Sequence, residues 1–237
     1  MTIPAIARFP WVGGPMSWLR RRTIETFRAH NPDWQVEVVQ IPQHIQRTPG
    51  LSPAHMSDWA RYLILRDEGG FVLDTDIVFT APVPDPWLDS EICVCTNGEP
   101  RVYQMAMMGA APGAPFFEAC AANAAFLAGE QGEYDYQEFG VLLMARVAAT
   151  VVAGLSWPAM VEGLYDQPMD ALCHVRWDDV DVLWDGPDVR MPPETIGVHW
   201  YGGHPRSRTI EMMSRIEQPD CFLVRLADDT RPGTRGG

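Results

Sequence analysis

Two aspartates two positions apart, Asp74 and Asp76, are the residues of this sequence best suited to bind a metal ion. They follow the apolar segment 71–73, and residues two apart on a strand point the same way, so both carboxylates should project from one side. Paired carboxylate oxygens can hold Mn²⁺ or Mg²⁺, and such an ion can hold a diphosphate. A second pair with this spacing, Asp179 and Asp181, lacks that context, so spacing alone identifies no site.

The segment before this pair carries two further candidates, Asp58 and Arg61. They are three positions apart and therefore share one face of a helix that we expect over residues 53–67. An ion pair on the helix surface is one interpretation. The other is that Asp58 binds sugar hydroxyls while the planar guanidinium of Arg61 contacts a phosphate oxygen or the sugar.

The elements that must position these residues alternate between strand and helix. Apolar or alternating segments predict strands at residues 3–12, 35–39, 71–73, 180–183 and 196–200, and two more between 92 and 110. Amphipathic or alanine-rich segments predict helices at residues 15–29, 53–67, 115–128 and 137–153. Three consecutive arginines, Arg20 to Arg22, are predicted to face solvent. The alternation predicts an α/β fold whose central, mostly parallel sheet is flanked by helices.

Composition is typical of a single globular domain. The 237 residues are 46% apolar and 21% charged, which predicts one domain over residues 1–231 and a disordered tail at 232–237. The five cysteines form no C-x-x-C pair and no signal peptide is recognisable, so we expect reduced thiols and a cytoplasmic protein. The most apolar stretch, 141–161, contains an arginine, a glycine and a proline, which favours a buried helix over stable membrane insertion.

Charge is distributed unevenly along the chain. The net charge is −13, all eighteen basic residues are arginine, and residues 67–188 carry three arginines against twenty-one acidic residues. An acidic middle argues against a broad nucleic-acid surface, because duplex binding rests mainly on neutralising phosphates. It does not exclude a local basic groove formed by the two ends of the chain.

Residues 74–78 also fit the nucleophile loop of haloacid-dehalogenase-type phosphatases, in which the first aspartate is phosphorylated. That chemistry uses a downstream cation, usually lysine, a further acidic pair, and a loop near the N-terminus. This sequence contains no lysine and its loop follows two earlier strand–helix units. The phosphatase is therefore disfavoured.

The segment 57–76 as a whole closely resembles the signature of the DXD-containing sugar-transferase family. It reads Ser-Asp-x-x-Arg-Tyr at its start, Gly-Gly at 69–70 and Leu-Asp-Thr-Asp at its end. That family includes initiating α-1,6-mannosyltransferases, capsular polysaccharide enzymes and, distantly, the large glucosylating toxins. Further segments are similar to the family in the same order, namely residues 3–34, 107–116, 138–141 and 198–200.

The resemblance implies a single-domain nucleotide-sugar transferase (GT-A-like) fold, a nucleotide-diphosphate sugar donor and a bound Mn²⁺ or Mg²⁺. By position, Trp11 would border the nucleotide base, although a tryptophan at a strand end is also typical of a core. Asp58 and Arg61 would contact the donor sugar and phosphate. Asp74 would touch ribose or sugar and share the metal with Asp76, its direct ligand.

The closing segment of the family leaves its residues less defined. His199 would be a further metal ligand, with a hydrogen-bonded core histidine as the alternative. The family often closes with a Ser-Trp pair near the diphosphate, whereas residues 202–206 here read Gly-Gly-His-Pro-Arg. His204 or Arg206 would supply that phosphate contact, and which of the two histidines meets metal or phosphate stays open.

These observations predict a metal-dependent, retaining glycosyltransferase of the hexosyltransferase type. Since no side chain can be named as a covalent nucleophile, front-face attack is the favoured mechanism. The alternative from another class is a non-catalytic glycan- or nucleotide-binding module on the same fold. The sequence leaves open the donor sugar, its base, the oligomeric state and the acceptor, which could be a glycan, a lipid-linked sugar or a hydroxymethylated DNA base.

Overall fold

The computed structural model describes residues 2–96, 103–130, 132–151, 163–186 and 188–229. The chain divides into two compact units that alternate along the sequence. Unit 1 comprises Met1–Gly13, Gln35–Asp74 and Pro84–Gln167, and unit 2 comprises Gly14–Trp34, Thr75–Val83 and Pro168–Gly237. The single domain over 1–231 stays a prediction, and the tail at 232–237 lies outside the described residues.

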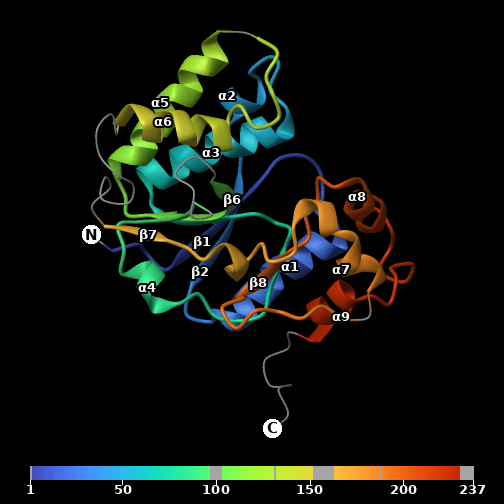
Figure 1. Ribbon diagram of the computed structural model, residues 1–237. Helices are drawn as coiled ribbons and strands as arrows, with labels where there is room; N and C mark the ends of the chain where they lie inside the picture. The colour runs from blue at the N-terminus through green and yellow to red at the C-terminus, as the bar shows by residue number, and fades with distance from the viewer. Residues whose placement is uncertain (1, 97–102, 131, 152–162, 187, 230–237) are drawn as a thin grey trace. The chain divides into compact units, whose positions relative to one another are not determined.

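A six-stranded sheet forms the centre of unit 1 (Figure 1). Its strands, in spatial order, are β2 (Gln35–Gln40), β1 (Ile6–Trp11), β3 (Gly70–Leu73), β6 (Gln104–Ala110), β5 (Ile92–Cys95) and β7 (Leu164–Asp166). β1 runs parallel to β2 and β3, and β5 runs parallel to β7. Only β6 is reversed, because it pairs antiparallel with both β3 and β5. The predicted mostly parallel sheet is confirmed.

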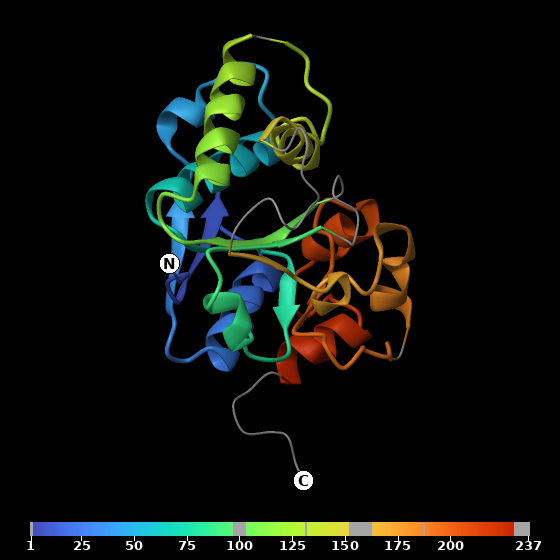
Figure 2. The same ribbon diagram turned by 60° about the vertical axis from the view of Figure 1, so that its left-hand side comes forward.

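The helices of unit 1 flank this sheet (Figures 1 and 2). One face carries α2 (Gln43–Gln46), α3 (Pro53–Asp67), α5 (Pro115–Gly129) and α6 (Val141–Val151), and the short α4 (Asp85–Leu88) lies on the other side. α3 packs on β3 and on α5, which in turn packs on α6. The core between helices and sheet includes Leu65, Val72, Met108, Phe117 and Leu143, all fully buried. The predicted α/β architecture is confirmed.

Local sequence explains why α3 begins and ends where it does. Ser52 Oγ accepts the His55 N–H at 3.2 Å while His55 Nδ1 accepts the Ser52 N–H at 3.3 Å, a reciprocal cap before the proline that opens the helix. Gly69 and Gly70 both have positive φ, and a Cβ at Gly70 would lie 2.7 Å from the carbonyl oxygen of Ile6. Only glycine fits this turn, which leads directly from α3 into β3.

Unit 2 is built around α1 (Trp18–His30) and a two-stranded sheet of β4 (Ile77–Phe79) and β8 (Gly197–His199). Its other elements are 3₁₀ helices at Met169–Ala171 and Trp177–Asp179, α7 (Asp181–Asp185), α8 (Pro205–Glu211) and α9 (Phe222–Asp229). α1 packs against β4 and α9, and α7 packs against α9. The core of the unit includes Leu19, Val78, Leu183, Val198 and Leu223.

One predicted element of unit 2 is wrong. The strand expected at 180–183 is helical, because Asp181–Asp185 form α7. Leu183 and Trp184 are its buried residues, and together with the buried N-cap Val180 they have the spacing of three and four that marks a helix face. Residues 180–183 hold only three apolar residues, too few to distinguish the two periods. In the described part of the chain, no helix is both long and apolar enough to cross a membrane.

Candidate functional site

In unit 1, Arg61 joins the two acidic residues that the sequence predicted there, Asp58 and Asp74. The guanidinium is buried; its Nη1 donates to the Met105 carbonyl at 2.6 Å and its Nη2 donates to Asp74 Oδ1. Its Nε lies 3.9 Å from Asp58 Oδ1. The Asp74 N–H donates to the carbonyl of Ala106 on β6, which fixes the chain just after β3. Asp58, Arg61 and Asp74 therefore form one connected group.

Asp58 is held in an environment that disfavours its charge. Burial raises the pKa of its carboxyl to about 7, and Asp74 adds to the rise while Arg61 opposes it. Gly140, just before α6, lies beside it: a Cβ there would be 2.8 Å from Asp58 Oδ2. The space around this carboxylate therefore depends on a glycine at position 140.

In unit 2, Asp76 pairs with His199 because β4 and β8 lie side by side, with Ile77 opposite His199. Asp76 Oδ1 lies 3.3 Å from His199 Nε2, and Oδ2 accepts the Gly202 N–H at 2.6 Å. Burial alone would raise the pKa of Asp76, but His199, Arg20 and the Gly202 N–H hold it well below its usual range. Burial would lower the pKa of His199, but Asp76 raises it well above its usual value. The two form a buried ion pair.

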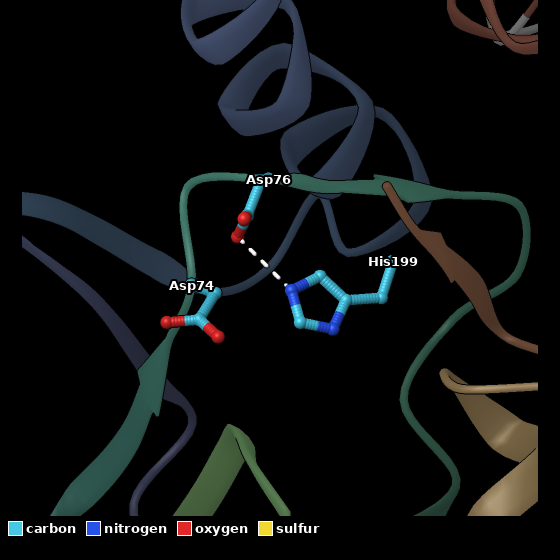
Figure 3. Close-up of side chains that lie close together, drawn as sticks. All are labelled: Asp74, Asp76 and His199. Atoms are coloured by element: carbon cyan, nitrogen blue, oxygen red, sulfur yellow. Dashed lines mark ion pairs between the residues drawn. The ribbon is translucent and has the colours of Figure 1, made fainter. Parts of the chain in front are cut away.

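The DXD segment brings a further carboxylate to this pair (Figure 3). One ligand atom from each of Asp74, Asp76 and His199 lies within 4.8 Å of the others. Within the described ranges, this is the one such group of three or more His, Cys, Asp or Glu residues. The second D-x-D, Asp179 and Asp181, is exposed on a 3₁₀ helix and at the start of α7.

The ring of His199 is oriented by neighbours in unit 2. Cys173 Sγ lies 3.8 Å from His199 Nδ1, and the Tyr201 ring packs against the imidazole with centroids 4.1 Å apart. Tyr201 has a φ of 47°, a left-handed conformation uncommon for a bulky residue. Its hydroxyl donates to the Val175 carbonyl at 3.0 Å. The strained backbone and this hydrogen bond fix the ring that supports His199.

Three other residues were predicted from the sequence, namely Trp11, His204 and Arg206. Trp11 ends β1 and is partly buried. The ring of His204 caps α8 by accepting the Arg206 N–H at 3.3 Å, and lies edge-on to Trp177. Arg206 is exposed and its guanidinium ion-pairs with Asp185 on α7. The proposed base and diphosphate contacts of these residues stay predictions.

The predicted solvent exposure is wrong for Arg20 and Arg22, and Gly202 was not among the predicted site residues. Arg20 was expected to face solvent, but its side chain is 17% exposed and its Nη1 donates to Thr75 Oγ1 within the DXD segment at 2.6 Å. Arg22, whose side chain is 20% exposed, also turns inward, and nothing in three consecutive arginines distinguishes these two from the exposed Arg21. Gly202 stands in the conspicuous Gly-Gly stretch, but its role as a backbone donor to Asp76 needed the fold.

Residues 19–93 match a family described as a glycosyltransferase sugar-binding region containing DXD motif. The matched span runs from α1 into β5 and includes Asp58, Arg61, Asp74 and Asp76. The match confirms the resemblance over this region, and it supports glycosyl transfer as the general activity. It gives no support to the phosphatase alternative. No curated protein matches the chain.

Several solved glycosyltransferase structures are similar to this chain. One, titled PaToxG Glycosyltransferase, is 14% identical with a TM-score of 0.49, over 65% of this chain and 71% of that chain. The apo-form glycosyltransferase GlyE of Streptococcus pneumoniae TIGR4 is 10% identical with a TM-score of 0.45, over 83% of this chain and 54% of that chain. A second GlyE structure is 12% identical with a TM-score of 0.43. The chain spans about half the length of the GlyE chains.

Proposed function

We propose that this chain, whose residues 19–93 carry the DXD sugar-binding region of a glycosyltransferase, transfers a hexose from a nucleotide-diphosphate sugar to a hydroxyl acceptor. One observation carries the proposal. Only Thr75 separates two aspartates that each belong to a charged group, Asp74 with Arg61 and Asp58 in unit 1 and Asp76 with His199 in unit 2. The first group has the chemistry to bind sugar hydroxyls, and the second has the chemistry to bind a metal ion that holds a diphosphate.

The donor sugar would be bound by Asp58 and Arg61. With a pKa of about 7, the Asp58 carboxyl is partly protonated near neutral pH, so it can both donate to and accept from sugar hydroxyls. Arg61 supplies a positive charge that Asp74 and Met105 already hold in one orientation. A pre-oriented guanidinium stabilises charge that develops on the leaving phosphate. Asp74 would also contact ribose or sugar.

The donor set at the DXD segment fits a divalent ion. Two carboxylates and one imidazole are ligands that Mn²⁺ accepts, and the hard oxygens alone suit Mg²⁺. Asp76 would be the direct ligand, and Asp74 would complete the protein's contribution together with His199 once the metal displaces the proton of its imidazole. A bound divalent ion would offset the negative charge of the departing nucleoside diphosphate. The low pKa of Asp76 keeps its carboxylate anionic over the whole physiological range.

Three further residues have proposed roles around the nucleotide. Trp11 would stack on the base from the end of β1. His204 or Arg206 would contact the diphosphate, and Arg206 must exchange its partner Asp185 for the phosphate to do so. Arg206 is exposed on α8, so the exchange would bury no charge.

We further propose transfer with retention of the anomeric configuration by front-face attack. The bond from the anomeric carbon to the phosphate oxygen breaks, the acceptor oxygen bonds to the same face, and the leaving phosphate takes the acceptor's proton. A glycan or lipid-linked sugar is the favoured acceptor class, and a hydroxymethylated DNA base is the less favoured one because residues 67–188 are strongly acidic.

A panel of sugar nucleotides tests this proposal. Purified protein is incubated with each donor in Mn²⁺, in Mg²⁺ or in EDTA, and mass spectrometry detects free nucleoside diphosphate and released sugar. We expect turnover of one donor class that needs the metal. Donor binding without turnover of any donor would instead indicate a non-catalytic binding module.

A further inference from the structure

Arg20 makes a dense set of contacts within unit 2, next to the DXD segment. Its Nε donates to Glu211 Oε1 at 2.5 Å and its Nη2 to Glu211 Oε2 at 3.1 Å, a two-point pair between α1 and α8. Its Nη1 donates to Thr75 Oγ1 at 2.6 Å. The side chains of Arg20 and Glu211 are 17% and 13% exposed, so solvent screens this pair only weakly.

Two further contacts fix the guanidinium beside Asp76. Its carbon lies 5.2 Å from the centre of the Trp200 ring, within reach of a cation–π interaction. At Gly202, a Cβ would lie 2.2 Å from Arg20 Nη2 and 3.2 Å from Asp76 Oδ2. The glycine therefore lets the guanidinium approach the loop whose N–H binds the Asp76 carboxylate.

We infer that Arg20 is a positioning residue, which holds the middle residue of the DXD segment and thereby directs the carboxylate of Asp76. The inference rests on the proposed function. Thr75 has one hydroxyl, and its hydrogen bond to Arg20 fixes the chain immediately before Asp76. Glu211 prevents the guanidinium from rotating away. Arg20, Thr75 and Glu211 thus act as one clamp on the metal-binding loop.

A purely structural role for Arg20, joining α1 to α8, makes different predictions. It implies that loss of Arg20 lowers the stability of unit 2 while Thr75 contributes nothing to the metal site. Arg22 is the matched control, because it lies on the same helix and joins α1 to α9 through the carbonyls of Ala227 and Asp228. Its contacts do not include Thr75, Asp76 or Gly202.

The test measures Mn²⁺ affinity by electron paramagnetic resonance, with thermal unfolding measured in parallel. Thr75→Val keeps the shape of the side chain but removes its hydroxyl, and Arg20→Lys removes the planar fork. We expect both to weaken Mn²⁺ binding by about fivefold or more, as for the loss of one hydrogen bond to a charged group. Thr75→Val should lower the melting temperature by only a few degrees, as for the loss of one hydrogen bond, and Arg22→Gln should bind Mn²⁺ like the unmodified protein. Wild-type Mn²⁺ affinity in Thr75→Val would overturn the clamp.

A second measurement separates this inference from the proposed function. If the unmodified protein binds no Mn²⁺, the metal-dependent function fails, but hydrogen exchange still reports the clamp. The backbone amides of residues 75–77 and 200–202 should then exchange faster in Thr75→Val and in Arg20→Lys than in the unmodified protein. In Arg22→Gln they should exchange at the unmodified rate. If these amides exchange at the unmodified rate in Thr75→Val and Arg20→Lys, the positioning role of Arg20 is refuted, whether or not the chain transfers sugar.

Discussion

Asp58 is buried where its charge is disfavoured, so we expect its ionised carboxylate to lower the free energy of unfolding while it serves the proposed donor site. Asp58→Asn replaces the carboxyl with a neutral amide of nearly the same shape beside Arg61 and Gly140. Because burial raises the pKa of Asp58 to about 7, the folded state binds a proton more tightly than the unfolded chain, where the value is 3.8. Stability therefore falls as the pH rises between these two values, and the loss is complete above 7.

The size of the effect follows from the two pKa values. Linkage between proton binding and folding lowers the free energy of unfolding, relative to its value at low pH, by about 2 kcal/mol at pH 5 and about 4 kcal/mol at pH 8. This assumes that Asp58 ionises in the folded protein. The side chain is 15% exposed, so solvent screening reduces this only modestly. Asp58→Asn should thus gain about 2–3 kcal/mol over the unmodified protein between pH 5 and pH 8. Turnover of the donor should fall at the same time.

Urea unfolding of both proteins at several pH values measures this difference. Asp67→Asn, on the same helix, is the matched control, because the hydrogen bond from Arg66 lowers the pKa of that exposed carboxyl. Its substitution should bring no gain in stability at high pH, since a lowered pKa stabilises the fold above its ordinary value. The opposing outcome is that the two proteins differ in free energy of unfolding by the same amount from pH 5 to pH 8. That result would refute the claim that the site disfavours the charge of Asp58.

Three further substitutions test the donor site. Arg61→Lys should reduce donor turnover by about tenfold or more, because an ammonium cannot reproduce the fork, and steady-state kinetics with near-normal activity would contradict this. Trp11→Ala should weaken nucleoside diphosphate binding by about tenfold in calorimetry, while Trp11→Phe should keep most of the affinity. If Trp11→Ala lowers folding stability but not affinity, Trp11 belongs to the core. Gly140→Ala should lower kcat/KM for the donor, because its Cβ would lie 2.8 Å from Asp58 Oδ2, whereas Gly129→Ala meets nothing within 4 Å and should be silent.

The sequence predicted the part of the site that local rules determine. Ser52 and the proline after it mark the start of α3, the glycine pair at 69–70 marks its end, and the short apolar run after them is β3. Asp58, Arg61 and Asp74 all lie within this continuous stretch. Their contact could therefore be anticipated, because a helix face and a strand end place them near one another.

Contacts between distant segments could not be predicted in the same way. The partners of Arg20 are 55 and 191 positions away, and neither distance leaves a periodic pattern in the sequence. The Asp76–His199 pair depends on the pairing of β4 with β8. The strand predicted at 196–200 is β8, but β4 is only three residues long, too short for an alternating pattern to identify, and its pairing with β8 leaves no sign in the sequence. His199 was found only because its motif resembles a family. Its ion pair with Asp76 and the supporting Tyr201 follow from packing.

Metal-dependent release of nucleoside diphosphate by matched variants tests the central claim most directly. The unmodified protein should hydrolyse its sugar nucleotide with Mn²⁺ and lose that activity in EDTA. Asp76→Asn should reduce the rate by about a hundredfold or more, because the proposed direct metal ligand loses its charge. Asp179→Asn, in the exposed second D-x-D, should keep the full rate. Full activity in EDTA, or an Asp76→Asn rate within a few-fold of the unmodified protein, would contradict a DXD-bound metal.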